Sequence, residues 1–277
     1  MITLYKNNFQ FEHKTSSGPI KEHYISHMHL EWQILYVLDG RTSFFLNNAT
    51  YQLQAGDLIL IHPLFFHFAT PDADLTYERI VISFPEEIIP PLLLSELKNF
   101  PYFFRLPDDS PIKTLLFQSS EIAQNYSNSD AYFAITNILQ IILLHLKYQP
   151  QSSEDFLKPI ITNPLLKDIL DYIENNLMEC SNLENITNHF YISISWLSHT
   201  FKKYLNITPK QYINYKKILL SQKLINNGIH PSIAYLNVGF NDYSTFYRLY
   251  KKFLNTNPQT EYKNRGTTIS PPKTKAD

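Results

Sequence analysis

Residues Leu197–Ile213 read LSHTFKKYLNITPKQYI, and Phe246–Tyr262, which begin 49 positions later, read FYRLYKKFLNTNPQTEY. Aligned without gaps, both segments carry a Lys-Lys pair, then Leu-Asn, then Pro at matching positions. A helical unit has therefore been duplicated, and two copies are too few for a repeat solenoid.

Each copy predicts a helix with a defined end. Apolar residues recur three and four positions apart, which places them on one helix face. These residues are Leu197, Phe201 and Tyr204 in the first copy, and Phe246, Tyr250 and Phe253 in the second. Asn206 and Asn255 follow at the left-handed C-cap position, and a proline comes where the helix cannot continue.

The lysine pairs lie beside this apolar face, at Lys202-Lys203 and Lys251-Lys252. An isolated pair would indicate only a solvated surface. Two pairs at matching points of duplicated helices favour contact with one polyanion.

The chain has 277 residues and 44% hydrophobic content, enough for two domains. Its net charge of −1 conceals an asymmetry. Residues 1–162 hold 10 Lys/Arg and 17 Asp/Glu, whereas residues 193–265 hold 11 Lys/Arg and 2 Asp/Glu, a balance of +9. A basic end on a neutral chain favours nucleic-acid binding.

Cys180 is the single cysteine, so no intramolecular disulfide can form and a reducing compartment fits. The sequence begins without a basic-then-apolar signal. The longest apolar run, Ala131–Leu146, is shorter than the roughly 18 residues of a membrane span and contains His145. We expect a cytoplasmic protein with no membrane partner.

Residues 1–90 predict short strands separated by Gly- and Asn-containing turns, which indicates a barrel or sandwich. The expected strands are Trp32–Leu38, Thr42–Leu46, Thr50–Leu53, Asp57–His62 and Glu78–Phe84. Prolines then punctuate a poorly periodic connection, and two helices are expected at 111–125 and 130–149. The second has a heptad-like stripe of Tyr132, Ile135, Leu139, Ile142 and Leu146, which predicts packing on the barrel or pairing with a second copy.

Histidines stand out among the strands. His27-Met28-His29 lies 11 residues before Gly40, and the run from Gly56 to His62 is followed by His67. This pattern resembles the cupin-like sensor domain of AraC-type regulators. Metal-binding cupins add a Glu to their first motif, but Gln33 stands at that position here, and the glycine expected after Pro63 is absent.

An amide is a poor metal ligand, and three imidazoles alone make a weak case for a metal. We therefore expect no metal and no cofactor in this domain, and no catalytic residues. The expected pocket binds a small polar molecule between aromatic walls. Its candidate ligand-binding residues are His27, His29, Gln33, Tyr36 and His67.

The C-terminal part predicts two helix-turn-helix units. The first comprises a short helix within Ser181–Ile192 and a second helix capped by Ser193. Pro209–Asn226 forms a long connector, and the second unit runs from about Ser232 to Leu254, with its second helix starting at Asp242 or Tyr243. Two such helices on one face fit successive major grooves, about 34 Å apart.

Four motifs carry a second resemblance. They are Ser193-x-x-x-Leu197-x-x-x-Phe201-Lys-Lys, Thr208-Pro209-x-x-Tyr212-Ile213, Gly239-Phe240-Asn-Asp-x-Ser244-x-Phe246-x-Arg248 and Asn257-Pro258-x-x-Glu-Tyr262. The span 163–265 resembles the DNA-binding domain of the AraC/XylS family of transcriptional regulators. The implied fold is α+β in two domains: a cupin-like barrel with two helices at 1–150, a linker at 151–162, an all-α double helix-turn-helix domain at 163–265 and a disordered tail at 266–277.

The chain departs from the family pattern at three places. Asn206 and Asn255 replace the glycines of the two turns, and Lys217 replaces an arginine of the connector. Ile233-Ala234 stands one residue too far from Gly239. Either Ala234 and Tyr235 take the usual Ile-Ala positions, or the helix start has shifted.

By position, the resemblance assigns base contacts to Ser195, Trp196, Ser198 and His199 in the first unit, and to Tyr243, Ser244, Tyr247 and Arg248 in the second. Arg248 is the best candidate, because a guanidinium can contact O6 and N7 of guanine together. Lys202, Lys251 and Lys252 are expected to contact phosphates.

The resemblance implies a ligand-responsive, sequence-specific regulator, an activator of genes for carbohydrates or related metabolites, and not an enzyme. Its expected partners are promoter or operator DNA, a small-molecule effector of the sugar type, RNA polymerase, and a second copy bound through the helix at 130–149. The alternative is a metal-dependent cupin enzyme with a helical appendage. A regulator that responds to partner proteins is a third possibility.

Overall fold

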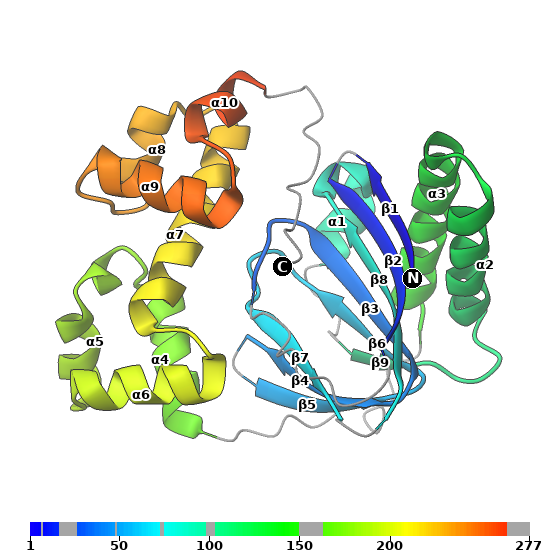
Figure 1. The fold of residues 1–277 in the computed structure, drawn as a ribbon, viewed down its shortest axis with the longest axis horizontal. Coiled ribbons are helices and arrows are strands. Elements are labelled where there is room, and N and C mark those ends of the chain that lie inside the picture. Colours follow the sequence, from blue (N-terminus) through cyan, green and yellow to red (C-terminus); the bar gives the residue numbers. More distant parts are fainter. Residues whose placement is uncertain are drawn as a thin grey trace. The chain divides into compact units, whose positions relative to one another are not determined.

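The computed structural model describes residues 1–6, 8–16, 27–47, 49–72, 75–97, 103–149 and 163–264. The chain divides into two compact units, one within residues 1–160 and the other mainly within 161–277, with Ser26–Leu30 and Asn47–Ala49 grouped with the second. The expected linker and tail lie outside the described residues. The N-terminal region is rich in sheet and the C-terminal region is helical, so the α+β prediction is confirmed (Figure 1).

Two sheets make up most of the N-terminal unit (Figure 1). The six-stranded sheet has the order β1 (Ile2–Lys6), β2 (Phe9–Ser16), β8 (Tyr77–Phe84), β3 (Trp32–Asp39), β6 (Asp57–Ile61) and β9 (Phe103–Arg105). The three-stranded sheet has the order β5 (Ala49–Gln54), β4 (Arg41–Leu46) and β7 (His67–Pro71). In the six-stranded sheet every pair of neighbours is antiparallel.

Strand β3 is buried on both faces, which explains its nearly continuous apolar sequence. Ile34 and Tyr36 belong to a core shared with the helices, whereas Leu35 and Val37 belong to a core shared with the small sheet. Successive side chains of a strand point to opposite faces. The large sheet is therefore the middle layer, with helices on one side and the small sheet on the other.

The helical layer contains α1 (Pro91–Leu97), α2 (Pro111–Asn125) and α3 (Asn128–Lys147), and a short 3-10 turn, η1 (Glu86–Ile88), precedes α1. Helices α2 and α3 pack together beside β1 (Figure 1). Four residues of the predicted α3 stripe are fully buried in the unit's own core, namely Ile135, Leu139, Ile142 and Leu146. This stripe holds the domain together and leaves the opposite face of α3 outside.

Helix α3 is long and apolar enough, by length and composition, to cross a membrane. It has 20 residues and a mean hydropathy of 1.3, so the helix is longer than the apolar run Ala131–Leu146 that the sequence indicates. A core helix has the same composition, and the buried stripe of α3 accounts for it.

The C-terminal unit consists of helices. They are α4 (Pro164–Asn175), the 3-10 turn η2 (Glu179–Ser181), α5 (Leu183–Phe190), α6 (Ile194–Leu205), α7 (Pro209–Asn226), α8 (Pro231–Asn237), α9 (Tyr243–Leu254) and α10 (Pro258–Lys263). The pairs α5–α6 and α8–α9 form the two expected helix-turn-helix units, joined by α7 (Figure 1). Half of the residues of α7 are buried, and they include polar Lys216, Lys217 and Ser221. Helix α7 is therefore a shared core element.

Acid should destabilise the N-terminal unit through His62, whose ring lies 4.3 Å from that of Trp32 and 5.2 Å from that of Phe65. Burial lowers the pKa of His62 from 6.5 to about 4. Between these values the unfolded chain binds a proton that the folded chain does not. Stability is therefore full above pH 6.5 and is lost as the pH falls towards 4.

We expect His62→Phe to keep the ring contacts and to lose less stability than the wild type between pH 7 and pH 5. The melting temperature as a function of pH measures this difference, with His145→Phe, an exposed position on α3, as the control. Parallel pH curves for the wild type and His62→Phe would contradict the assignment.

Candidate nucleic-acid interface and ligand site

Helices α6 and α9 begin at matching caps. The Ser193 side chain accepts a hydrogen bond from the Trp196 N–H (3.1 Å), and Asp242 accepts one from the Thr245 N–H (2.7 Å). The hydrogen bonds from Thr245, with smaller contributions from the Ser244 N–H and the Arg248 charge, lower the pKa of Asp242. Each cap satisfies an N–H group that has no partner within its helix.

The same two helices end in the same way. Asn206 and Asn255 adopt left-handed conformations, with φ of 60° and 53°, as predicted for asparagine in place of glycine. Thr208 then caps α7 and Asn257 caps α10, with a proline at the start of each new helix. The duplication therefore extends to the backbone turns, and each second helix is held between two equivalent caps.

The inward faces of the two helices are packed differently. The Phe201 and Tyr212 rings meet edge to face at 5.8 Å. At the corresponding positions, 49 residues on, the Tyr250 hydroxyl donates to the Glu261 carboxylate (2.5 Å). Glu261 is 6% exposed and also accepts from the Gln222 amide of α7 (2.5 Å). An aromatic contact in the first unit is thus replaced by a buried polar network in the second.

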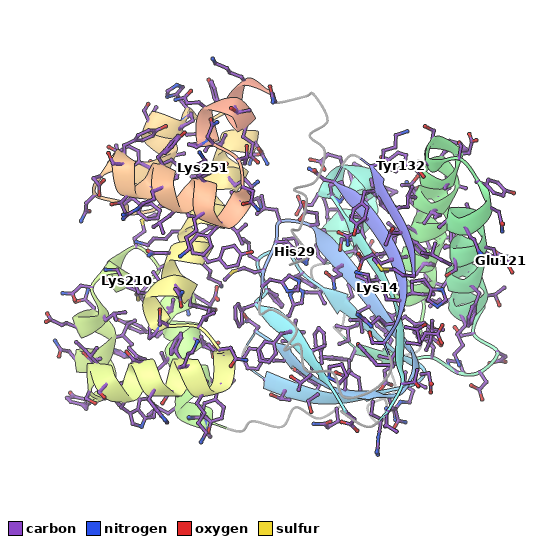
Figure 2. The ribbon with its side chains drawn as sticks, viewed as in Figure 1. Lys14, His29, Glu121, Tyr132, Lys210 and Lys251 are labelled. Atoms are coloured by element: carbon purple, nitrogen blue, oxygen red, sulfur yellow. The ribbon has the colours of Figure 1, made fainter. Side chains whose placement is uncertain are left out.

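Most of the predicted DNA-contacting residues lie on outward faces, and Figure 2 labels Lys251 of α9 among them. The exposed ones are Ser195, His199, Lys202, Ser244, Tyr247, Arg248, Lys251 and Lys252. Trp196 and Ser198 are half-buried. Each helix therefore presents a polar face beside its packed one, with Arg248 on the outer side of α9.

Two of these residues have contacts that the sequence did not indicate. The ring of Tyr243 packs against Tyr235 and Phe246, and its hydroxyl is buried. The Lys202 ammonium donates to the Asn206 carbonyl at the end of its own helix (3.0 Å). Tyr243 thus helps to pack the second unit, and Lys202 helps to cap α6.

The positive charge of the C-terminal region is not all at its surface. Lys216 and Lys217 are 4% and 1% exposed and lie inside the unit. Lys216 forms an ion pair with Glu174, whose carboxylate also accepts from the Tyr212 hydroxyl (3.0 Å). Two of the 11 basic residues counted in the sequence are therefore structural. Their place on the long connector between the two helix-turn-helix units was the available signal.

The register of α8 agrees with the alternative in which Ala234 and Tyr235, and not Ile233 and Ala234, take the usual Ile-Ala positions. Ala234 is fully buried and Tyr235 packs against Phe246 (ring centroids 5.9 Å apart), whereas Ile233 is 52% exposed. Ala234 and Tyr235 therefore take the inward positions. The connection from α8 to α9 includes Gly239, with φ of +76°.

The predicted ligand residues do not form one group. Gln33 is buried and accepts from the Ser83 hydroxyl (3.4 Å), on the face of β3 that also bears Leu35. Tyr36 points to the opposite, helix-covered face. Burial raises the pKa of Tyr36, as do the charges of Asp108 and Asp57. Strand alternation thus separates Tyr36 from Gln33.

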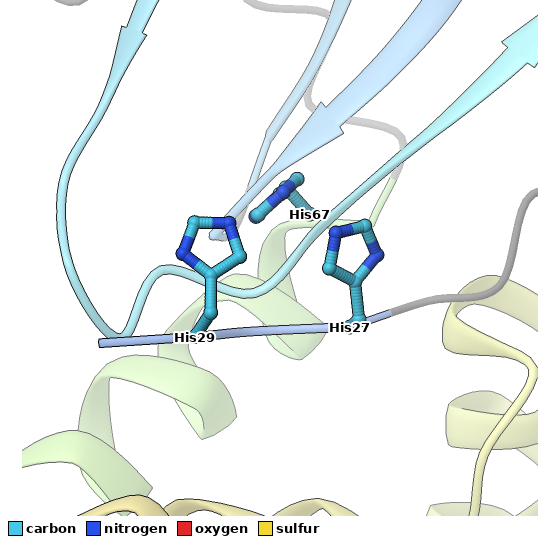
Figure 3. A group of neighbouring side chains, drawn as sticks. All are labelled: His27, His29 and His67. Atoms are coloured by element: carbon cyan, nitrogen blue, oxygen red, sulfur yellow. The ribbon is translucent and has the colours of Figure 1, made fainter. Parts of the chain in front are cut away.

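Three of the predicted residues do come together. The candidate ligand nitrogens of His27, His29 and His67 all lie within 4.8 Å of one another (Figure 3). The Nδ1–H of His67 donates to the Phe65 carbonyl (2.9 Å), which assigns the lone pair of the neutral ring to Nε2. Such a set can donate to or accept from a polar ligand, and three imidazoles are also ligands for a transition metal.

Comparisons with known proteins agree with both halves of this description. The family model described as "AraC-like ligand binding domain" matches residues 15–142, and the "Helix-turn-helix domain" model matches residues 186–265. A ligand-binding domain joined to helix-turn-helix units defines a DNA-binding transcriptional regulator. The chain belongs to the AraC/XylS family of transcriptional regulators.

Its relatives include two HTH-type transcriptional regulators. YdiP of Escherichia coli is 24% identical over 245 residues, covering 84% of this chain and 80% of YdiP. YdeC of Bacillus subtilis is 26% identical over 248 residues, covering 84% of each chain. Among solved structures, ToxT of Vibrio cholerae is 13% identical, and the match covers 92% of this chain and 97% of ToxT with a TM-score of 0.36.

The caps of the reading helices can be tested by stability. Ser193→Ala removes the hydrogen bond to the Trp196 N–H, and we expect a loss of about 1 kcal/mol in the free energy of unfolding of the C-terminal unit. Urea unfolding measures the loss. Ser195→Ala, an exposed serine two residues further on, is the matched control and should change little. Equal effects of the two changes would show that the cap bond contributes nothing.

Proposed function

We propose that this protein is a ligand-responsive, sequence-specific transcriptional activator that reads two adjoining DNA segments with α6 and α9. It acts in the cytoplasm, has no catalytic role and recruits RNA polymerase. The N-terminal unit binds a small polar effector, of the sugar or related metabolite class. The effector must bind one arrangement of the protein better than another, since only differential affinity can shift the balance between them.

The observation that carries this proposal is the repetition of one capped helix. Both α6 and α9 begin at a side-chain cap, end at a left-handed asparagine and bury one face, so each presents a rigid outer face. A rigid helix with an exposed polar face is what the major groove accepts. Arg248 supports base readout because its side chain is exposed on the outer side of α9.

The effector class is supported by the chemistry of the buried polar groups. Gln33 and His67 are both nearly fully buried in a unit whose core is mainly apolar and aromatic. A few polar groups within aromatic surroundings suit a small polar molecule. The site of such a ligand on this chain is assigned to His27, His29, Gln33 and His67.

The alternative is a metal-dependent enzyme, and the cluster of His27, His29 and His67 is the observation in its favour. Metal content of the purified full chain separates the two. Stoichiometric, tightly held iron, manganese or zinc would favour the enzyme. Metal-free protein that gains thermal stability with a metabolite would favour the effector-binding regulator.

DNA reading is tested by selecting from random duplex DNA with the full chain. We expect enrichment of two short segments about one helical turn apart. Arg248→Ala should remove the preference at one base position, worth about 1–3 kcal/mol of discrimination. Lys251→Ala, three residues further along α9, should weaken all sequences alike and reduce the salt dependence.

The selection has clear contrary outcomes. Loss of base preference in Lys251→Ala but not in Arg248→Ala would reverse the two roles. Absence of any enriched sequence with the wild type would overturn the reading function itself.

Pairing of two copies through α3 is a further part of the proposal. With the core stripe buried, the outer face of α3 still carries Phe133, Ile141, Leu144 and Tyr148, all exposed. Their spacing of eight, three and four residues places them on one side of the helix. Exposed apolar side chains in such a row indicate a contact surface.

We expect the wild type to sediment as a dimer and Phe133→Glu to sediment as a monomer, because Phe133 is 72% exposed and a charge there would be buried on pairing. Leu92→Glu, at an equally exposed position on α1, is the control and should remain dimeric. Sedimentation velocity at several concentrations measures both. A Phe133→Glu variant that stays dimeric would move the interface away from α3.

A further inference from the structure

Lys217 lies in the middle of α7 and is 1% exposed. Its ammonium donates one hydrogen bond to the Gly239 carbonyl (3.0 Å) and another to the Met178 carbonyl (3.3 Å). Burial lowers its pKa. A buried ammonium is costly unless its hydrogens have acceptors, and here backbone carbonyls supply them.

The two carbonyls belong to different halves of the DNA-binding unit. Met178 lies between α4 and α5, on the approach to the first helix-turn-helix pair. Gly239 lies between α8 and α9, in the turn of the second pair. One side chain of the connector therefore holds a backbone segment of each half.

Gly239 lies close to both the Lys217 ammonium and the Met178 backbone. Its φ of +76° favours glycine, and a Cβ there would lie 3.1 Å from the Lys217 Nζ and 3.3 Å from the Met178 Cα. The Lys217 Nζ also lies 5.8 Å from the centre of the Phe240 ring. Two backbone segments thus converge on one ammonium group, and the turn before α9 lies directly against the segment before α5.

We propose that Lys217 is a positioning residue that fixes the separation and rotation of α6 relative to α9, and so determines which spacing of the two DNA segments the protein accepts. This inference rests on the proposed function. The two reading helices are linked modules, and the gain from binding both segments depends on a linker geometry that matches their span. A loosened connection should bind each segment as before and lose the preference between spacings.

The first experiment measures the affinity of the full chain for the selected duplex, for versions with one or two base pairs inserted between its segments, and for each segment alone. We expect the wild type to lose affinity by about tenfold or more on insertion, as expected for linked modules. Lys217→Met should bind single segments like the wild type but lose most of the spacing preference. Lys217→Arg should retain it, because a guanidinium also donates to two carbonyls.

Lys223→Met is the matched control, since Lys223 lies on the same helix with its side chain exposed. It should keep the spacing preference. If Lys217→Met does not fold, Lys217→Gln takes its place, because its amide is one bond shorter and cannot serve both carbonyls. A folded Lys217 variant without the ammonium that keeps the wild-type spacing preference would overturn the inference.

The second experiment needs no DNA. Spin labels at Lys203 and Lys252, matching positions of the two copies, report the distance between α6 and α9. Burial raises the pKa of the Cys180 thiol to about 11, so this buried cysteine should not compete for label. We expect a narrow distance distribution in the wild type and a broad one in Lys217→Met.

Identical distributions would overturn the role of Lys217 whatever the DNA result. A different outcome would separate the two claims. If the wild type binds no preferred sequence but the distance distribution still broadens in Lys217→Met, the reading function is refuted and the positioning role stands.

Discussion

The C-terminal unit depends on one constraint: both helix-turn-helix pairs pack on the same helix, α7. Phe201 packs on Tyr212 near the start of α7, and Phe246 and Tyr250 pack with Ile218 and Ile225 further along it. Burial of α7 therefore stabilises both halves at once, and it explains why polar residues inside that helix need internal partners. Lys216, Lys217 and Gln222 all find such partners.

The N-terminal unit meets a related constraint with sheets. Strands β3 and β6 have apolar side chains on both faces, so a single layer of helices could not cover them. The small sheet covers one face and α1, α2 and α3 cover the other. The polar effector that we propose would then contact the few polar side chains that this arrangement leaves inside, such as Gln33 and His67.

Much of this architecture could be predicted from the sequence, because strong local signals coincide with the elements. Helices α2 and α7 have the predicted bounds, since each begins at a proline preceded by a serine or threonine. The left-handed asparagines 206 and 255 follow from the Leu-Asn repeat. The sequence did not predict β1, β7, β9 or α1, because short edge strands and a proline-rich connection carry little periodicity. It also did not predict β2, an inner strand of eight residues in which only Phe9 and Phe11 are apolar.

Side-chain placement was less accessible. Tyr36 was grouped with Gln33 although an odd spacing on a strand puts the two on opposite faces. The heptad-like stripe of α3 predicted a packing surface on this helix. Packing on the domain core and packing on a second copy give the same sequence pattern. Buried lysines look like surface charge in a composition count, and only the packing of α7 distinguishes them.

The unequal interiors of the two repeated halves have one more consequence. Where the first half has the ring contact of Phe201 with Tyr212, the second has the hydroxyl–carboxylate–amide chain of Tyr250, Glu261 and Gln222. The two copies are therefore no longer interchangeable. A phenylalanine in place of Tyr250, as at Phe201, would deprive the buried Glu261 carboxylate of a hydroxyl donor.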